Sequence, residues 1–234
     1  MPCRTLSHPF DWPRPSAARY DGAQPNVNGH TGSTMKMKRA FFFVLLATEL
    51  VACTTTRVGI NYSPPAQMTA APSSEADVSV GRFSDDRGEP PNWLGAIRGG
   101  YGNPLKKLES DQPVSELVTQ VFAAGLKARG LAAESSTAQY ALTGSIKELD
   151  CSQFARKEAN VQIQLVVHES KNGKQVFSNL YHASNVEGSA LTLSAGIFGS
   201  VEELRALMEK TLQQAVDQAL DDPALRSAVR PASP

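Results

Sequence analysis

The chain has 234 residues with 23 Lys or Arg against 23 Asp or Glu, so its formal net charge at pH 7 is zero. From Cys53 onward the count is 17 basic against 20 acidic side chains. This balance lacks the basic surplus typical of nucleic-acid-binding domains, and we expect no nucleic acid partner.

Residues 1–34 are rich in Pro, Gly, Asn and Ser and show no periodic apolar pattern. Such a segment cannot bury enough apolar surface to fold, so we expect it to be disordered. An export signal begins near the N-terminus of its chain. We therefore predict that translation starts at Met35 or Met37 and that residues 1–34 are a misassigned extension.

Residues 35–52 have the pattern of a signal peptide: three cations, then an apolar run over 40–47 that is too short to span a bilayer, which needs about 20 residues. The sequence that closes the run, Leu50, Val51, Ala52 and Cys53, resembles the bacterial lipobox. In such signals the cysteine sulfur receives a diacylglyceryl group, and cleavage before the cysteine frees its amine for a further chain such as palmitate. Several acyl chains on Cys53 would anchor the protein stably to a membrane.

The remaining chain divides by composition. Residues 53–75 contain the lipidated cysteine and a Pro/Ser/Ala-rich tether, with a strand-like piece over 57–62 that we expect to pair with the sheet. Residues 76–230 are long enough for one periplasmic domain, and residues 231–234 form a disordered tail. Only Cys151 lies inside the domain, so no internal disulfide is expected.

The first half of the domain is predicted to hold two strands and a helix. Alternating apolar residues indicate a strand over 77–83, followed by a polar turn over 84–88. A short strand over 93–98 precedes a glycine-rich flexible loop. The helix runs over 113–129, begins with proline and ends before Gly130. Its apolar stripe consists of Val114, Leu117, Val118, Val121 and Phe122.

Three strands follow, over 140–149, 159–169 and 175–186. The last two flank Asn172-Gly173, which predicts a two-residue type I′ hairpin. In that register Ile163, Leu165 and Val167 lie opposite His182, Leu180 and Ser178 on one face, which we assign to the core because it is more uniformly aliphatic. The other face pairs Gln164, Val166 and His168 with Tyr181, Asn179 and Phe177.

A final long helix is predicted over 201–220, because Ser200 and Glu203 form a capping box. Asp222-Pro223 opens one more short helical turn. The long helix has an apolar stripe of Leu204, Leu207, Met208, Leu212, Ala215, Val216 and Ala219. The order of elements predicts an α+β fold, with an antiparallel-rich mixed sheet and two main helices packed on one face.

Few side chains suggest chemistry. The hairpin register places His168 and His182 on opposite faces, so we expect no shared metal. Asp85 and Asp86 fit a polar turn better than an acid–base pair, because consecutive strand residues point apart. Cys151 is expected to be a structural thiol. We therefore expect no catalytic residue, no metal and no cofactor.

The segment from Gly188 to Gly199 is flexible in composition yet strongly apolar. Two interpretations stay open. Its apolar residues either pack into the core, or form an exposed interaction loop that meets a partner or the membrane. These residues are Leu191, Leu193, Ile197 and Phe198.

Several motifs together resemble the YajG family of Gram-negative lipoproteins. They are the lipobox, Asp85-Asp86-Arg87, the helix end Leu126-Lys127-Ala128-Arg129-Gly130, and Asn185-Val186-Glu187-Gly188-Ser189. The resemblance covers about residues 76–229 and carries over only one functional residue, the lipidated Cys53. It implies an outer-membrane lipoprotein that faces the periplasm. Thr54 fits, because Asp after the cysteine is the usual inner-membrane retention signal in enteric bacteria.

These observations favour a non-catalytic, lipid-anchored binding or accessory module of the cell envelope. Its expected partners are the membrane, through Cys53, and an envelope protein. One alternative is a binder of small molecules or cell-wall fragments. A second is an envelope hydrolase that uses Asp85, Asp86 or a histidine.

Overall fold

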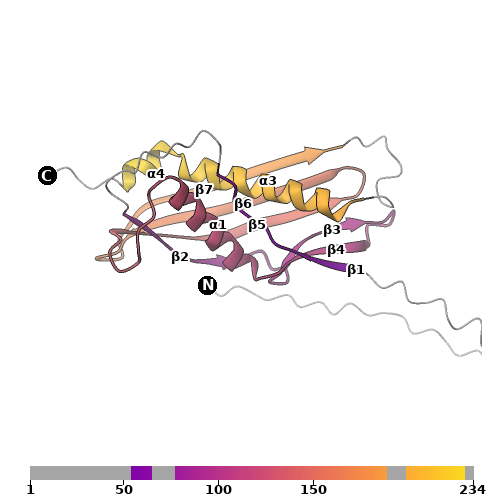
Figure 1. Cartoon of the computed structure of the whole chain (residues 1–234), viewed down its shortest axis with the longest axis horizontal. Helices are drawn as coiled ribbons and strands as arrows, with labels where there is room; N and C mark the ends of the chain where they lie inside the picture. Colours follow the sequence, from indigo (N-terminus) through magenta and orange to yellow (C-terminus); the bar gives the residue numbers. More distant parts are fainter. Residues whose placement is uncertain (1–53, 65–76, 189–198, 230–234) are drawn as a thin grey trace, which may run out of the picture. The chain divides into compact units, whose positions relative to one another are not determined.

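The computed structural model describes residues 54–64, 77–188 and 199–229. They form seven strands and three helices (Figure 1). The strands are β1 (Thr54–Val58), β2 (Val78–Asp85), β3 (Trp93–Arg98), β4 (Pro104–Ser110), β5 (Tyr140–Gln153), β6 (Lys157–Glu169) and β7 (Gln175–Glu187). The helices are α1 (Val114–Ala128), α3 (Val201–Leu220) and α4 (Pro223–Ala228).

All seven strands belong to one mixed sheet in the order β1-β4-β3-β5-β6-β7, with β2 also paired to β5. Strands β2 and β3 share one edge of β5: β2 runs parallel to residues 140–146, and β3 runs parallel to residues 151–153. The longest ladders, β5 with β6 and β6 with β7, are antiparallel. This arrangement confirms the predicted α+β class.

Helices α1 and α3 cover the same face of the sheet (Figure 1). Helix α1 packs on β2, and α3 lies over β5, β6 and β7. The apolar stripes predicted for both helices are buried, and Phe122 of α1 stacks on Phe83 of β2 with ring centroids 4.8 Å apart. Ser200 and Asp222 cap α3 and α4 as predicted, through their side-chain oxygens.

The predicted register of the β6–β7 hairpin is wrong by one residue. Ile163 lies opposite Tyr181 and Leu165 opposite Asn179, so Leu180 is on the uncovered face and is 45% exposed. The loop contains four residues, because Glu169 N donates to Lys174 O and Asn172 Oδ1 accepts from Lys174 N. The buried assignment of Ile163, Leu165 and Val167 is confirmed. That of His182, Leu180 and Ser178 is wrong, because the shifted register buries Tyr181 and leaves these three side chains exposed.

Two strand predictions were incomplete. Strand β4 was missed because Pro104 and the pair Lys106-Lys107 hide its alternation. Strand β5 extends to Gln153, four residues beyond the prediction, because an irregularity between Ile146 and Glu148 shifts its buried positions from even to odd numbers.

Part of the predicted tether pairs with the sheet, as expected, although the strand lies at 54–58 rather than 57–62. Strand β1 runs parallel to β4, with Thr54 opposite Lys106 and Val58 opposite Ser110. Downstream of β1, Ile60 is 8% exposed and belongs to the core. The N-terminal edge of the sheet is therefore built from the residues that directly follow Cys53.

Candidate functional site

The predicted anchor residue directly precedes the first strand. Cys53 itself, the lipobox residues Leu50, Val51 and Ala52, and the residues upstream lie outside the described ranges. Thr54 is the first residue of β1, so one peptide unit of about 3.8 Å separates the Cα atoms of the anchor and the sheet. A lipid on Cys53 would therefore hold the sheet edge close to the membrane without a flexible spacer.

A buried ionic network fastens the segment after β1 to the helices. The Arg129 side chain at the end of α1 is 4% exposed and donates to both carboxylate oxygens of Asp221, at 3.0 and 2.8 Å. It also donates to Asp217 at 2.9 Å and to the Tyr62 hydroxyl at 2.9 Å. Tyr62 in turn donates to Asp217 at 2.6 Å. One guanidinium thus joins the N-terminal segment, α1 and α3.

The protonation states in this network are fixed by its hydrogen bonds. Burial alone would lower the pKa of Arg129, but its bonds with Asp221, Tyr62 and Asp217 outweigh burial and raise that pKa. The Arg129 hydrogen bond lowers the pKa of Asp221. Burial is the main cause that raises the pKa of Tyr62, and the hydrogen bond to Asp217 is the second. At neutral pH the network therefore contains the Arg129 cation, the Asp221 carboxylate and the neutral Tyr62 phenol.

Sequence reasoning noted Arg129 only as part of a motif and missed its partners. Asp217 and Asp221 occur one turn apart on α3, which places both carboxylates on one side of the helix. This spacing, together with an arginine at the end of another helix, was the only sequence signal that could have indicated the network.

Asp85 and Asp86 occupy separate environments, although the predicted turn over 84–88 is partly wrong, because Ser84 and Asp85 still belong to β2. Asp85 accepts from Arg87 Nε at 2.7 Å and from its Nη2 at 2.8 Å, and the Arg87 side chain is 3% exposed. Arg87 also donates to the carbonyls of Trp93 and Leu149, so it fills the break between β2 and β3. Asp86 pairs with Lys147 at 2.7 Å. Hydrogen bonds to these cations lower the pKa of both carboxyls.

The histidine prediction needs correction. Because the register is shifted, His182 lies opposite Gln162 and shares the uncovered face with His168. Gln162 is six residues along β6 from His168, about 20 Å at about 3.3 Å per residue. Distance, and not opposite orientation, keeps the two imidazoles apart. Within residues 54–64, 77–188 and 199–229, no group of three His, Cys, Asp or Glu side chains is placed to hold a metal.

Two other titratable groups are perturbed by burial. Cys151 is fully buried and free, and burial raises the pKa of its thiol well above the usual range. Asp150 accepts from the Trp93 indole at 3.0 Å, and burial raises the pKa of its carboxyl. Sequence reasoning assigned the structural thiol but did not single out Asp150.

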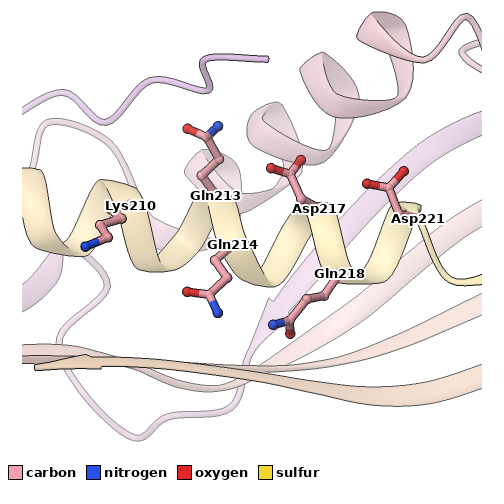
Figure 2. A pocket seen from close by; sticks show the side chains of 6 residues that line it. All are labelled: Lys210, Gln213, Gln214, Asp217, Gln218 and Asp221. Carbon is pink, nitrogen blue, oxygen red and sulfur yellow. The ribbon is translucent and has the colours of Figure 1, made fainter. Parts of the chain in front are cut away.

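A shallow depression of about 540 Å³ lies along the outer surface of α3. Asp217 and Asp221 point to one side of the helix, whereas Gln214 and Gln218 point to the other (Figure 2). Gln214 accepts from Asn185 of β7, and Asp217 and Asp221 bind Arg129. Most ligand sites are lined largely by apolar and aromatic residues. The residues that line this depression are all polar or charged: Lys210, Gln213, Gln214, Asp217, Gln218 and Asp221.

The face of β5–β7 opposite the helices bears mostly uncharged polar side chains along β6 and β7. Ser184 donates to Asn160 at 2.6 Å, and Gln164 donates to Ser178 at 2.8 Å. Leu180 and Val186, which are 45% and 50% exposed, share this face. We call it the open face, and no helix covers it in the part of the chain that the structure describes. The predicted loop residues Leu191, Leu193, Ile197 and Phe198 lie outside the described ranges.

A family model described as uncharacterized lipoprotein matches residues 64–230. The chain therefore belongs to this lipoprotein family, which places it among membrane-anchored envelope proteins. No protein with a curated functional description matches it in sequence. None of the helices described at 114–128, 201–220 and 223–228 is long and apolar enough to cross a membrane.

Two solved structures are similar to this chain at low sequence identity. Protein XCC0632 from Xanthomonas campestris is 15% identical with a TM-score of 0.51, over 74% of this chain and 96% of that one. A minor lipoprotein from Acinetobacter baumannii is 10% identical with a TM-score of 0.34, over 68% and 98% of the two chains. The similarity to XCC0632 shows a shared fold and nothing further.

Proposed function

We propose that this chain is a lipid-anchored outer-membrane lipoprotein that faces the periplasm and acts as a non-catalytic binding module of the cell envelope. The observation that carries the proposal is the start of β1 at Thr54, directly after the lipobox cysteine, in a chain of a lipoprotein family. Thr54, in place of the Asp that retains lipoproteins in the inner membrane, supports a location in the outer membrane. Within the family we propose that the chain is YajG-like, on the motifs around Arg87, Arg129 and Asn185.

The environments of the candidate catalytic groups support binding over catalysis. Asp85 and Asp86 are each engaged by their own cation, and the Cys151 thiol is buried and protonated. The open face, in contrast, offers hydrogen-bonding groups and two exposed aliphatic side chains to a protein partner. The depression on α3 is shallow and has no apolar or aromatic residue in its lining, so a small-molecule binder is the weaker candidate.

The anchor is tested by labelling growing cells with an alkyne analogue of palmitate. We expect the wild-type protein and a Cys151→Ser variant to carry the label and to fractionate with the outer membrane. A Cys53→Ser variant should lose both the label and the membrane association, because the lipobox sulfur that accepts the lipid is gone. Label on the Cys53→Ser variant would contradict the proposal.

The binding role is tested by placing a photo-crosslinking amino acid at Leu180 on the open face, or at Gln213 on the outer surface of α3. Both sites are in the same lipidated protein, so they sample the same membrane. We expect a discrete adduct with an envelope protein from position 180 and none from position 213. Equal adduct patterns from both positions would count against a partner on the open face.

A further inference from the structure

One end of the sheet is fixed beside the anchor. Strand β1 is parallel to β4, with Thr54 opposite Lys106, so the start of β4 is at the Cys53 end. The β3–β4 loop, residues 99–103, precedes β4 and shares this end. Strand β3 is parallel to the last residues of β5, with Ile97 opposite Gln153, so the β5–β6 turn at 154–156 lies there too. We call this the anchor end.

Exposed apolar side chains gather at the anchor end. The structure describes five large exposed hydrophobic residues, and three of them, Tyr101, Leu105 and Phe154, belong to these two loops or to the start of β4. Tyr101 is fully exposed, Phe154 is 50% exposed and Leu105 is 37% exposed. They come from two separate loops that the register brings to one end. Exposed apolar side chains that gather in one region mark sites of protein or membrane contact.

Unpaired cations flank these side chains. Arg98, Lys106 and Lys107 belong to the ends of β3 and β4 that meet this loop, and none of them lies within ion-pair distance of a carboxylate in the described residues. Arg98 donates to Gly102 O, and Lys106 donates to Gly199 O. The acidic side chains at this end are fewer than the cations: Glu158 pairs with Arg156, Glu187 and Glu203 share Lys157, and Asp150 attracts Arg98 from beyond ion-pair distance. The surplus charge at the anchor end is therefore positive.

We propose that the anchor end is a membrane-contacting surface, in which Tyr101, Leu105 and Phe154 enter the interfacial region of the bilayer and Arg98, Lys106 and Lys107 face anionic headgroups. Tyrosine favours the headgroup level, because its ring is apolar and its hydroxyl forms hydrogen bonds. Phe and Leu favour the boundary with the acyl chains. Basic residues near a membrane surface are attracted to anionic lipids.

This inference rests on the proposed lipid anchor. A lipid on Cys53 keeps the β1 edge within a few residues of the bilayer, so the side chains at the same end are the ones that can reach it. A membrane is favoured over a protein partner, because apolar loop tips flanked by cations match the layering of a lipid surface: apolar groups inside and anionic groups outside. The opposite end of β6, at the loop containing Asn172, would then project away from the membrane by about 40 Å.

The test uses the mature lipidated protein, residues 53–234, in phosphatidylcholine vesicles with or without phosphatidylglycerol. An environment-sensitive fluorophore is attached through Tyr101→Cys or, as a control, through Asn172→Cys. The Cys151 thiol is buried and should not react in the folded protein. Flotation of the same samples reports the anchor independently of the fluorophore.

We expect lipids with brominated chains to quench the label at position 101 about twofold or more relative to position 172. The quenching should increase with phosphatidylglycerol and decrease in the Arg98→Gln/Lys106→Gln/Lys107→Gln variant. Equal, weak quenching at both positions in protein that floats with the vesicles would overturn the proposal and leave the anchor intact. Failure to float would overturn both. Shielding of position 101 in whole envelopes but not in vesicles would indicate a protein partner and also overturn it.

Discussion

Replacing Arg129 by Met should lower the free energy of unfolding by about 3 kcal/mol. The substitution keeps the aliphatic volume but leaves Asp217, Asp221 and the Tyr62 hydroxyl without their shared donor. Removing one partner of a buried ion pair costs about 3–5 kcal/mol, and we expect the lower end because the Asp221 side chain is 40% exposed. Urea denaturation followed by circular dichroism measures the difference.

The matched control is Arg57→Met. Arg57 is 73% exposed and its Nε lies 4.0 Å from Glu109, so its loss should cost about 0.5 kcal/mol or less. Arg129→Lys should fall between the two, since an ammonium keeps the charge but cannot bind both Asp221 oxygens in a fork. Equal losses for Arg129→Met and Arg57→Met would show that the network does not stabilise the fold.

Acid pH gives a second readout for the same network. Arg129 lowers the pKa of Asp221 in the folded state, so the ionised carboxylate stabilises the fold above its unfolded-state pKa of about 3.9. That contribution is lost as the pH falls through the lower, folded-state pKa. The stability difference between wild type and Arg129→Met should therefore shrink as the pH is lowered below about 4. A difference that is constant from neutral to acid pH would contradict the assignment.

The regular elements with clean local patterns could be predicted from the sequence. Helices α1 and α3 each have an uninterrupted apolar stripe and a defined beginning and end, and tertiary packing buries those same stripes. The hairpin was harder, because Asn172-Gly173 is the signal of a two-residue turn. Here the Asn172 side chain binds the Lys174 amide, which favours a longer loop and shifts every β7 side chain to the opposite face.

The Arg129 network and the anchor end could not be predicted from the sequence. Arg129 lies 88 and 92 residues from Asp217 and Asp221, and no local pattern pairs side chains over such separations. The anchor end, too, is formed by contacts between residues that are far apart in the sequence. Tyr101 and Phe154 are unremarkable loop residues until the parallel pairing of β3 with β5, and of β1 with β4, brings their loops to the Cys53 end.

The second large effect is expected at Gly95, where β3 meets β5. Gly95→Ala should lower the free energy of unfolding by about 3 kcal/mol or more. A Cβ at this position would lie 1.8 Å from the Cys151 carbonyl oxygen, and backbone φ is +154°, which side chains rarely adopt. The contact is with backbone of the central strand, so it cannot be relieved by rotating a side chain. Strand β3 would have to separate from β5.

Gly100→Ala is the matched control, because a Cβ at position 100 meets nothing within 4 Å. It should change stability by about 0.5 kcal/mol or less. Both variants are compared by urea denaturation, and equal midpoints would contradict the close packing of β3 on β5. Because β3 and β4 present Tyr101 and the unpaired cations, the loosened strand in Gly95→Ala should also reduce bromolipid quenching at position 101, while Gly100→Ala should retain it. The close contact between Gly95 and the Cys151 backbone would then affect both the stability of the sheet and the membrane contact of the anchor end.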